Sequence, residues 1–290
     1  MMHVYIKLFM AAVFWGGTFI AGRVVAADVG PFSAAFLRFL IASVFLFGIV
    51  RMKEGRLPRL SPHQIVPVVC LGLTGVLSYN VFFFKVLKLI EAGRAAIIIA
   101  NNPILITLFS CLIFKEKMTP LKGVGILLSV TGAVIAISKG HLYSVLAGGL
   151  GWGEVFIFGC VSSWVLYSLI GKTVMTYLSP LASVAYSAAI GAAGLFVPAL
   201  LEGLFQEWGH LAARDWASLF YLGFFGTVIS FVWYYEGIKQ IGPMRASLFI
   251  NFVPISAIIL AFLILKEPLT PTLLIGTAFV CSGLYLTNRR

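Results

Sequence analysis

The sequence is poor in charge: Asp, Glu, Lys and Arg make up 11% of its 290 residues, against 60% in the hydrophobic set. Soluble domains carry roughly a quarter of charged residues. A chain with a mean hydropathy of +1.02 cannot bury all of its apolar groups inside a water-soluble globule. The composition therefore excludes an ordinary soluble protein and predicts an integral membrane protein whose surroundings are a lipid bilayer.

Motifs that carry chemistry are also scarce. The four cysteines lie in apolar runs and form no CxxC, and the four histidines lie in loops or near the N-terminus without ligand spacing. There is no GxxxxGK[ST] loop for nucleotide phosphates, and no Asp or Glu stands in the middle of an apolar run. We therefore expect no metal, no cofactor, no enzymatic activity, no ATP hydrolysis and no carboxylate proton relay.

Long apolar runs are what the sequence does contain. They cover residues 4–22, 31–50, 65–86, 92–114, 121–138, 150–171, 180–201, 216–237, 244–265 and 271–287. A helix needs roughly 20 apolar residues to cross a bilayer, and only helices or closed barrels satisfy the backbone in lipid. Because the runs are too long and too continuously apolar for barrel strands, they predict an all-α protein with ten transmembrane helices.

The positive charges indicate an orientation. If both termini are cytoplasmic, thirteen of the 21 Lys and Arg residues fall on the cytoplasmic side, seven fall outside, and Arg38 lies within a span. Cytoplasmic loops usually hold the excess of Lys and Arg. The net charge of +11 therefore reflects membrane topology, and we expect no nucleic-acid partner.

The two halves of the chain repeat each other. The matching pairs are Trp15 and Trp164, Gly22 and Gly171, Pro31 and Pro180, Arg94-Ala95 and Arg245-Ala246, Pro103 and Pro254, Lys115-Glu116 and Lys266-Glu267, and Thr119-Pro120 and Thr270-Pro271. We expect one five-helix repeat over residues 1–145 and a second over 146–290. Because five is odd, the second repeat is inverted in the membrane, an arrangement typical of carriers that work by alternating access.

The motifs Phe14-Trp15-Gly16-Gly17 and Phe36-Leu37-Arg38-Phe39, with the repeated Pro and Lys-Glu, resemble the EamA family of the drug/metabolite transporter superfamily. The resemblance covers essentially the whole chain. It implies ten helices with cytoplasmic termini in a bacterial inner membrane, a central cavity lined by helices 1–4 and 6–9, and export of amino acids or similar small metabolites. Among members, the chain looks most like the YddG-type aromatic amino-acid exporters.

Candidate substrate-binding residues are mid-span aromatic and amide side chains, which suit an amphipathic ligand. They are Trp15, Tyr79, Asn80, Phe83, Asn101, Trp164, Tyr167, Trp233, Tyr234 and Asn251. Ordinary helix packing explains any single one of them equally well. Pro103 and Pro254 predict kinks that free the carbonyls of Ile99 and Ile250.

Arg38 is the only basic residue well inside a predicted span, so it is a functional candidate. It could attract a substrate carboxylate, pair with a backbone carbonyl or extend outward, and we favour a structural or gating role. The leading prediction is a secondary carrier that exports aromatic or neutral amino acids as a monomer. A multidrug, organic-cation or nucleotide-sugar carrier on the same fold is the alternative.

Overall fold

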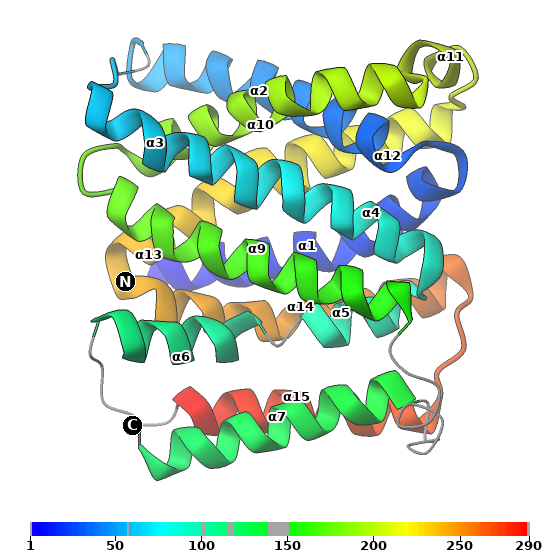
Figure 1. Cartoon of the computed structure of the whole chain (residues 1–290). Coiled ribbons are helices and arrows are strands. Elements are labelled where there is room, and N and C mark those ends of the chain that lie inside the picture. The colour runs from blue at the N-terminus through cyan, green and yellow to red at the C-terminus, as the bar shows by residue number, and fades with distance from the viewer. Residues whose placement is uncertain (1, 57, 100–101, 115–118, 139–150, 289–290) are drawn as a thin grey trace.

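The computed structural model describes residues 2–56, 58–99, 102–114, 119–138 and 151–288, and every regular element in these ranges is a helix (Figure 1). The elements are α1 (Met2–Asp28), α2 (Pro31–Lys53), α3 (Pro62–Leu71), η1 (Gly72–Ser78), α4 (Tyr79–Leu89), α5 (Ala92–Ile99), α6 (Asn102–Phe114), α7 (Pro120–Ser138), α9 (Trp152–Val174), α10 (Pro180–Glu202), α11 (Leu204–Trp208), α12 (Ala213–Gly223), η2 (Phe224–Ile229), α13 (Ser230–Ser247), η3 (Leu248–Asn251), α14 (Phe252–Leu260), η4 (Ala261–Leu265) and α15 (Pro271–Asn288). Proline occupies the first position of α2, α3, α7, α10 and α15, where its missing N–H has no helical partner to lose.

Among the described residues, seven helical stretches are long and apolar enough to cross a membrane. They are Met2–Asp28, Pro31–Lys53, Pro62–Leu89, Trp152–Val174, Pro180–Glu202, Ala213–Pro243 and Arg245–Leu265. Shorter apolar helices cover Ala92–Ile106, Gly123–Gly132 and Pro271–Gly283. The protein is therefore an all-helical, multi-pass membrane protein.

The helices lie side by side, and α1 begins at the same end of the bundle at which α15 ends (Figure 1). We call this the terminal end and the opposite one the far end. Helix α2 packs along α10 on one side of the bundle, and α7 packs along α15 on the other (Figure 1). Between these pairs, α1 contacts α13 and α14, while α9 contacts α4.

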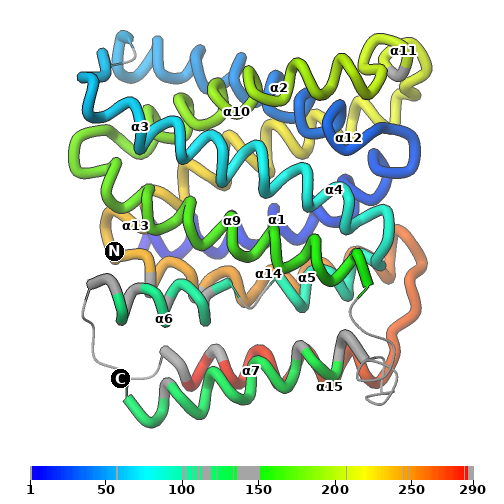
Figure 2. Tube along the Cα trace, in the orientation of Figure 1, coloured from blue at the N-terminus to red at the C-terminus, as the bar shows by residue number. Residues whose placement is uncertain are grey.

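Two of the predicted spans are not plain α-helices, because π-helical turns interrupt them. Figure 2 shows α3 and α4 running on through η1 as one track, and α12, η2 and α13 do the same. Side chains bond to carbonyls five residues earlier at these places: Thr227 Oγ1 donates to Leu222 O (3.0 Å) and Asn80 Nδ2 to Gly75 O (3.2 Å). This spacing matches the wider π turn, and such turns often occur at functional sites.

The span that contains Pro254 is also broken, by the 3₁₀ turn η3 directly before α14. Proline removes one helical hydrogen bond and crowds the preceding turn, so the break agrees with the kink expected from the sequence. The corresponding segment before Pro103 includes residues 100–101, which lie outside the described ranges.

Glycines let α7 and α15 approach until their backbones touch. A Cβ added at Gly132 would lie 2.6 Å from Gly276 O and 2.7 Å from Val280 N. In lipid, where apolar side chains gain little by leaving their surroundings, such close backbone packing is a main source of helix association.

Candidate functional site

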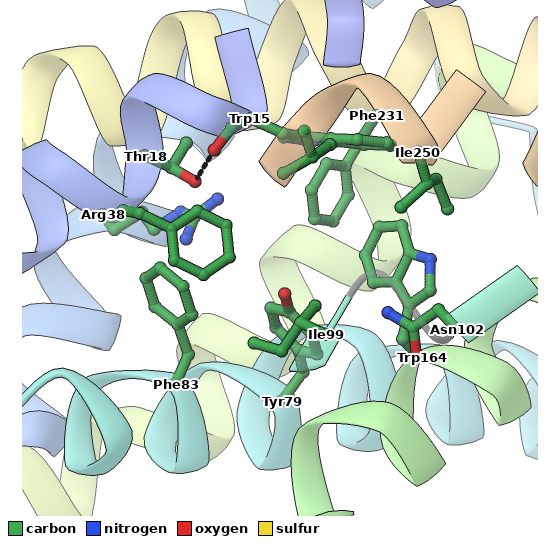
Figure 3. A pocket seen from close by; sticks show the side chains of 12 residues that line it. Trp15, Thr18, Arg38, Tyr79, Phe83, Ile99, Asn102, Trp164, Phe231 and Ile250 are labelled. Atoms are coloured by element: carbon green, nitrogen blue, oxygen red, sulfur yellow. Dashed lines mark hydrogen bonds between the residues drawn. The ribbon is translucent and has the colours of Figure 1, made fainter. Parts of the chain in front are cut away.

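A small cavity lies in the middle of the bundle, where helices from both halves of the chain meet. Its walls come from α1, α2, α4, α5, α6, α9, α13, η3 and α14 (Figure 3). The lining residues are Trp15, Thr18, Phe19, Arg38, Tyr79, Phe83, Ile99, Asn102, Trp164, Phe231, Ile250 and Val253. The resemblance implied helices 1–4 and 6–9, and of these only the seventh predicted span contributes no lining residue.

The cavity volume is about 30 Å³. Sites for small molecules usually enclose about 300–1,000 Å³, and one water takes up roughly 30 Å³ of liquid. In this structure the cavity is therefore about the size of one water molecule and too small for a metabolite.

Trp15 and Trp164, the pair related by the sequence repeat, meet at the cavity. Their ring centroids are 5.3 Å apart with the planes at 86°, an edge-to-face contact. Trp15 Nε1 donates to the carbonyl of Gly226 (3.0 Å), which fixes the orientation of its ring. Both rings also contact Phe231, so the wall of the cavity is aromatic and its shape is well defined.

Tyr79 and Phe83 continue this aromatic lining on α4. They are one helical turn apart, their rings stack with centroids 6.0 Å apart, and Tyr79 also lies 5.3 Å from Trp164. Apolar, aromatic walls favour a ligand with an apolar body.

Arg38 supplies the positive charge of the cavity, although its side chain is only 2% exposed. Its Nε donates to Thr227 Oγ1 (3.0 Å) and its Nη1 to Asn80 Oδ1 (2.8 Å). Asn80 follows η1 and Thr227 lies in η2. A single guanidinium thus connects the π-helical turn η2 to the first turn of α4 after η1, and so joins the two halves of the chain.

Several predicted site residues lie directly behind the cavity wall. Asn80 is fully buried and holds Arg38. Tyr167 packs against Trp164 and shares a hydrogen bond with Ser187 (3.2 Å). The ring of Tyr234 contacts those of Trp15 and Trp164. These residues position the lining side chains rather than forming part of the surface.

Other predicted residues lie elsewhere. Trp233 lines a second cavity, described below, and Asn251 and Pro254 are absent from the central lining. Pro254 is buried in α14. Asn101 lies outside the described residues, as does the side chain of Pro103.

Sequence reasoning overlooked part of the lining, and helical spacing could have found some of it. Thr18 and Phe19 lie three and four positions after Trp15 on α1, and so share its face. Ile99 and Ile250, the positions whose carbonyls were expected to be freed by proline, both line the cavity. Asn102 was passed over in favour of its neighbour Asn101, because an Asn-Asn pair gives no clue to which side chain faces inward.

A second cavity of about 280 Å³ opens at the terminal end. Trp233 lines it together with charged residues, including Lys7 and Glu236, which form an ion pair (2.7 Å). Val228 and Val232 also line it, whereas Phe231 lines the central cavity. The η2–α13 segment therefore separates the two cavities.

Polar contacts hold the far end together. Glu267 accepts hydrogen bonds from the backbone N–H groups of Ala92 (3.1 Å) and Gly93 (3.2 Å) at the start of α5. A carboxylate there also interacts favourably with the helix dipole. Lys266, with a left-handed backbone (φ 56°), turns the chain so that Glu267 reaches α5. Arg23 of α1 donates to the carbonyls of Leu87 and Ile90.

In the described part of the chain, no three His, Cys, Asp or Glu residues lie together in a way that could hold a metal ion. Among the described residues, no carboxylate and no histidine lines the central cavity. The arrangement offers aromatic surface, one guanidinium, one amide and the hydroxyls of Thr18 and Tyr79, which are groups that bind a small molecule.

A cavity between the helices of a multi-pass membrane protein is the kind of place in which membrane carriers bind their solutes. The EamA-like transporter family matches residues 2–138 and again residues 151–289, so the chain belongs to this family. It is a membrane transporter rather than an enzyme.

The relatives that match over nearly full length are also transporters by name. The chain is 28% identical to the "uncharacterized transporter YyaM" of Bacillus subtilis, covering 97% of this chain and 92% of that protein. It is 26% identical to an "uncharacterized transporter" of Archaeoglobus fulgidus, over the whole length of both. A solved crystal structure with 20% identity matches 98% of each chain with a TM-score of 0.72, which supports the fold alone.

Proposed function

We propose that this transporter exports aromatic or neutral amino acids, or similar small metabolites, from the cytoplasm by alternating access. The observation that carries the proposal is the small central cavity, enclosed by aromatic side chains from both halves of the chain. The direction of transport rests on the resemblance to YddG-type exporters.

Alternating access requires two similar halves, and we propose ten transmembrane helices arranged as inverted five-helix repeats over residues 1–145 and 146–290. The family matches once in each half, which supports a duplication. Helix packing also supports it, because these contacts have counterparts in which the two repeats trade places. The α1–α13 contact corresponds to the α9–α4 contact, and the α1–α14 contact corresponds to the α9–α6 contact. In the α2–α10 pair and in the α7–α15 pair, a helix of one repeat packs against the corresponding helix of the other.

The gating that we propose uses the two ends of the bundle in turn. The far end is held by Glu267 and Arg23, while the terminal end has the larger cavity. Movement of the η2–α13 segment would join that cavity to the central one. Release of the far-end contacts would open the opposite route.

We place both termini in the cytoplasm and the protein in a bacterial inner membrane. The excess of Lys and Arg on the terminal side supports this orientation. Each chain encloses its own cavity, which supports a monomer as the working unit. Labelling of single cysteines added at the two termini should place both on the cytoplasmic side, and labelling from opposite sides would refute the topology.

The lining disfavours the two alternative substrate classes. The guanidinium of Arg38 in the lining would repel an organic cation, and no carboxylate among the described lining residues offsets it. A nucleotide-sugar carrier would present several basic side chains to the phosphates, whereas Arg38 is the only one in the described lining.

The test is counterflow of a panel of amino acids, amines and nucleotide sugars in proteoliposomes that contain the purified full chain. Trp164→Ala should lower exchange of the accepted solute, because it removes a wall of the cavity. Trp152→Ala on the same helix is the matched control, since Trp152 is 73% exposed at the start of α9. Equal exchange by both variants would remove Trp164 from the site.

A further inference from the structure

We infer that Arg38 binds a carboxylate group of the transported solute, so that the cavity selects small aromatic carboxylates over amines and amides of the same shape. This inference rests on the proposed function and adds a chemical requirement to it.

The first observation is a buried charge without a countercharge. Arg38 is 2% exposed, and none of the ion pairs among the described residues includes it. Its two hydrogen-bond partners, Asn80 and Thr227, are neutral. They satisfy individual N–H groups but leave the positive charge unbalanced, and burying such a charge away from water is costly.

The second observation is where this charge lies. Arg38 lines the central cavity, and Figure 3 shows it beside Thr18 at one end of that cavity. The guanidinium is a fork of five N–H donors that suits a carboxylate in two-point contact. Nε donates to Thr227 and Nη1 to Asn80, so further donors of the guanidinium are available to a ligand.

The third observation is an acceptor at the opposite end. Asn102 is 2% exposed, and its Oδ1 has no hydrogen-bond partner among the described residues. Figure 3 places Asn102 beside Trp164, across the cavity from Arg38. Buried polar atoms are normally paired, so this one points to a ligand that donates a hydrogen bond.

Together these groups describe one kind of solute. A carboxylate meets Arg38, an aromatic or apolar body lies between Phe83 and the two tryptophans, and a hydrogen-bond donor reaches Asn102. An amine without a carboxylate would place a second positive charge near Arg38, and a neutral amide would leave the guanidinium unbalanced.

The experiment compares four probes of similar shape in counterflow with the full chain: phenylalanine, 3-phenylpropionate, phenylalaninamide and phenethylamine. The wild-type protein should exchange the two carboxylates roughly tenfold or more faster than the amide and the amine, as expected for loss of a bond to a charged group. Arg38→Gln should remove this preference. Arg51→Gln, an exposed arginine at the end of α2, should change it less than about twofold.

The possible outcomes distinguish failure of carboxylate recognition by Arg38 from failure of the proposed function. Exchange of the amide or amine as fast as the carboxylates would overturn the inference and leave a carrier of small aromatic solutes. Equal slowing of all four probes by Arg38→Gln would assign the residue a structural role and also overturn it. Exchange of none of the four would overturn the inference as well, whereas exchange of no solute in the wider panel would refute the proposed function.

A variant-free measurement covers the case in which Arg38→Gln does not fold. A ligand that binds only the folded state raises its stability, so 3-phenylpropionate should raise the thermal midpoint of the purified wild-type protein while phenethylamine should not. An equal effect of both, or of neither, would contradict carboxylate recognition.

Discussion

Replacing Asn80 with aspartate would place a carboxylate beside Arg38 with almost no change of shape. Asn80 Oδ1 already accepts from Arg38 Nη1 at 2.8 Å, so Asn80→Asp would neutralise the guanidinium in place. If Arg38 recognises the carboxylate of the solute, this built-in carboxylate competes with the solute for the same charge.

The size of the effect follows from the geometry. Two unit charges about 4 Å apart interact by about 4 kcal/mol at an effective dielectric constant near 20. Desolvation of the new carboxylate offsets part of this. We therefore expect the apparent affinity for 3-phenylpropionate to fall by roughly tenfold or more, which corresponds to about 1.4 kcal/mol or more. Exchange of phenethylamine should rise, because the cavity loses its net positive charge.

The assay is counterflow in proteoliposomes, reported as the ratio of 3-phenylpropionate to phenethylamine exchange. Asn80→Ala is the comparison variant, because it too loses the Nδ2 hydrogen bonds to the Gly75 and Val76 carbonyls but adds no charge. It also loses the contact with Arg38 that the aspartate keeps. It should lower the thermal midpoint and keep the preference for the carboxylate. Equal ratios in the two variants would refute the role of charge at this site.

Two further predictions concern the far end and the α7–α15 pair. Glu267→Gln should lower the thermal midpoint by an amount equivalent to about 0.3–1 kcal/mol, because the amide has one acceptor oxygen for the two N–H groups at the start of α5; an unchanged midpoint would show that this contact does not hold the end closed. Gly132→Ala should cost about 1–3 kcal/mol by overpacking, whereas Gly123→Ala on the same helix, with nothing within 4 Å of its Cβ, should not. Size-exclusion profiles and melting curves in detergent compare the two glycine variants. An equal loss of stability in both would contradict the close approach of α7 and α15.

The membrane-embedded helical fold could be predicted from the sequence, because lipid imposes strict local rules. Each apolar run must satisfy its own backbone and must be long enough to cross. Both properties can be counted along the chain. A local break before Pro254, where the structure has the 3₁₀ turn η3, was predictable for the same reason, since the missing N–H and the steric clash of proline are local.

The family could also be recognised from local motifs. The Trp-Gly-Gly and Leu-Arg-Phe segments identify EamA-like transporters, and the family match over residues 2–138 and 151–289 confirms that membership. The same motifs did not define the substrate, because they supply only Trp15 and Arg38 to the cavity, and the other lining residues lie outside them.

The sequence predicted which kinds of residue line the cavity, but it did not determine which individual residues face it. Trp15, Trp164, Tyr79, Phe83 and Arg38 reach the cavity, and mid-span aromatic and charged residues are unusual enough to be noticed. Trp233 has the same character, yet it lines the cavity at the terminal end. On an all-apolar span, hydrophobic periodicity does not distinguish an inward face from a lipid face.

Only the tertiary structure brought Arg38 of α2, Asn80 of α4 and Thr227 of η2 into one hydrogen-bonded group. Thr227 is 189 residues from Arg38 in the chain. It lies within the π-helical turn η2. The sequence determined the helices and their environment, since each depends on neighbours along the chain. The cavity surface depended on how distant helices rotate against one another, a property that no single segment encodes.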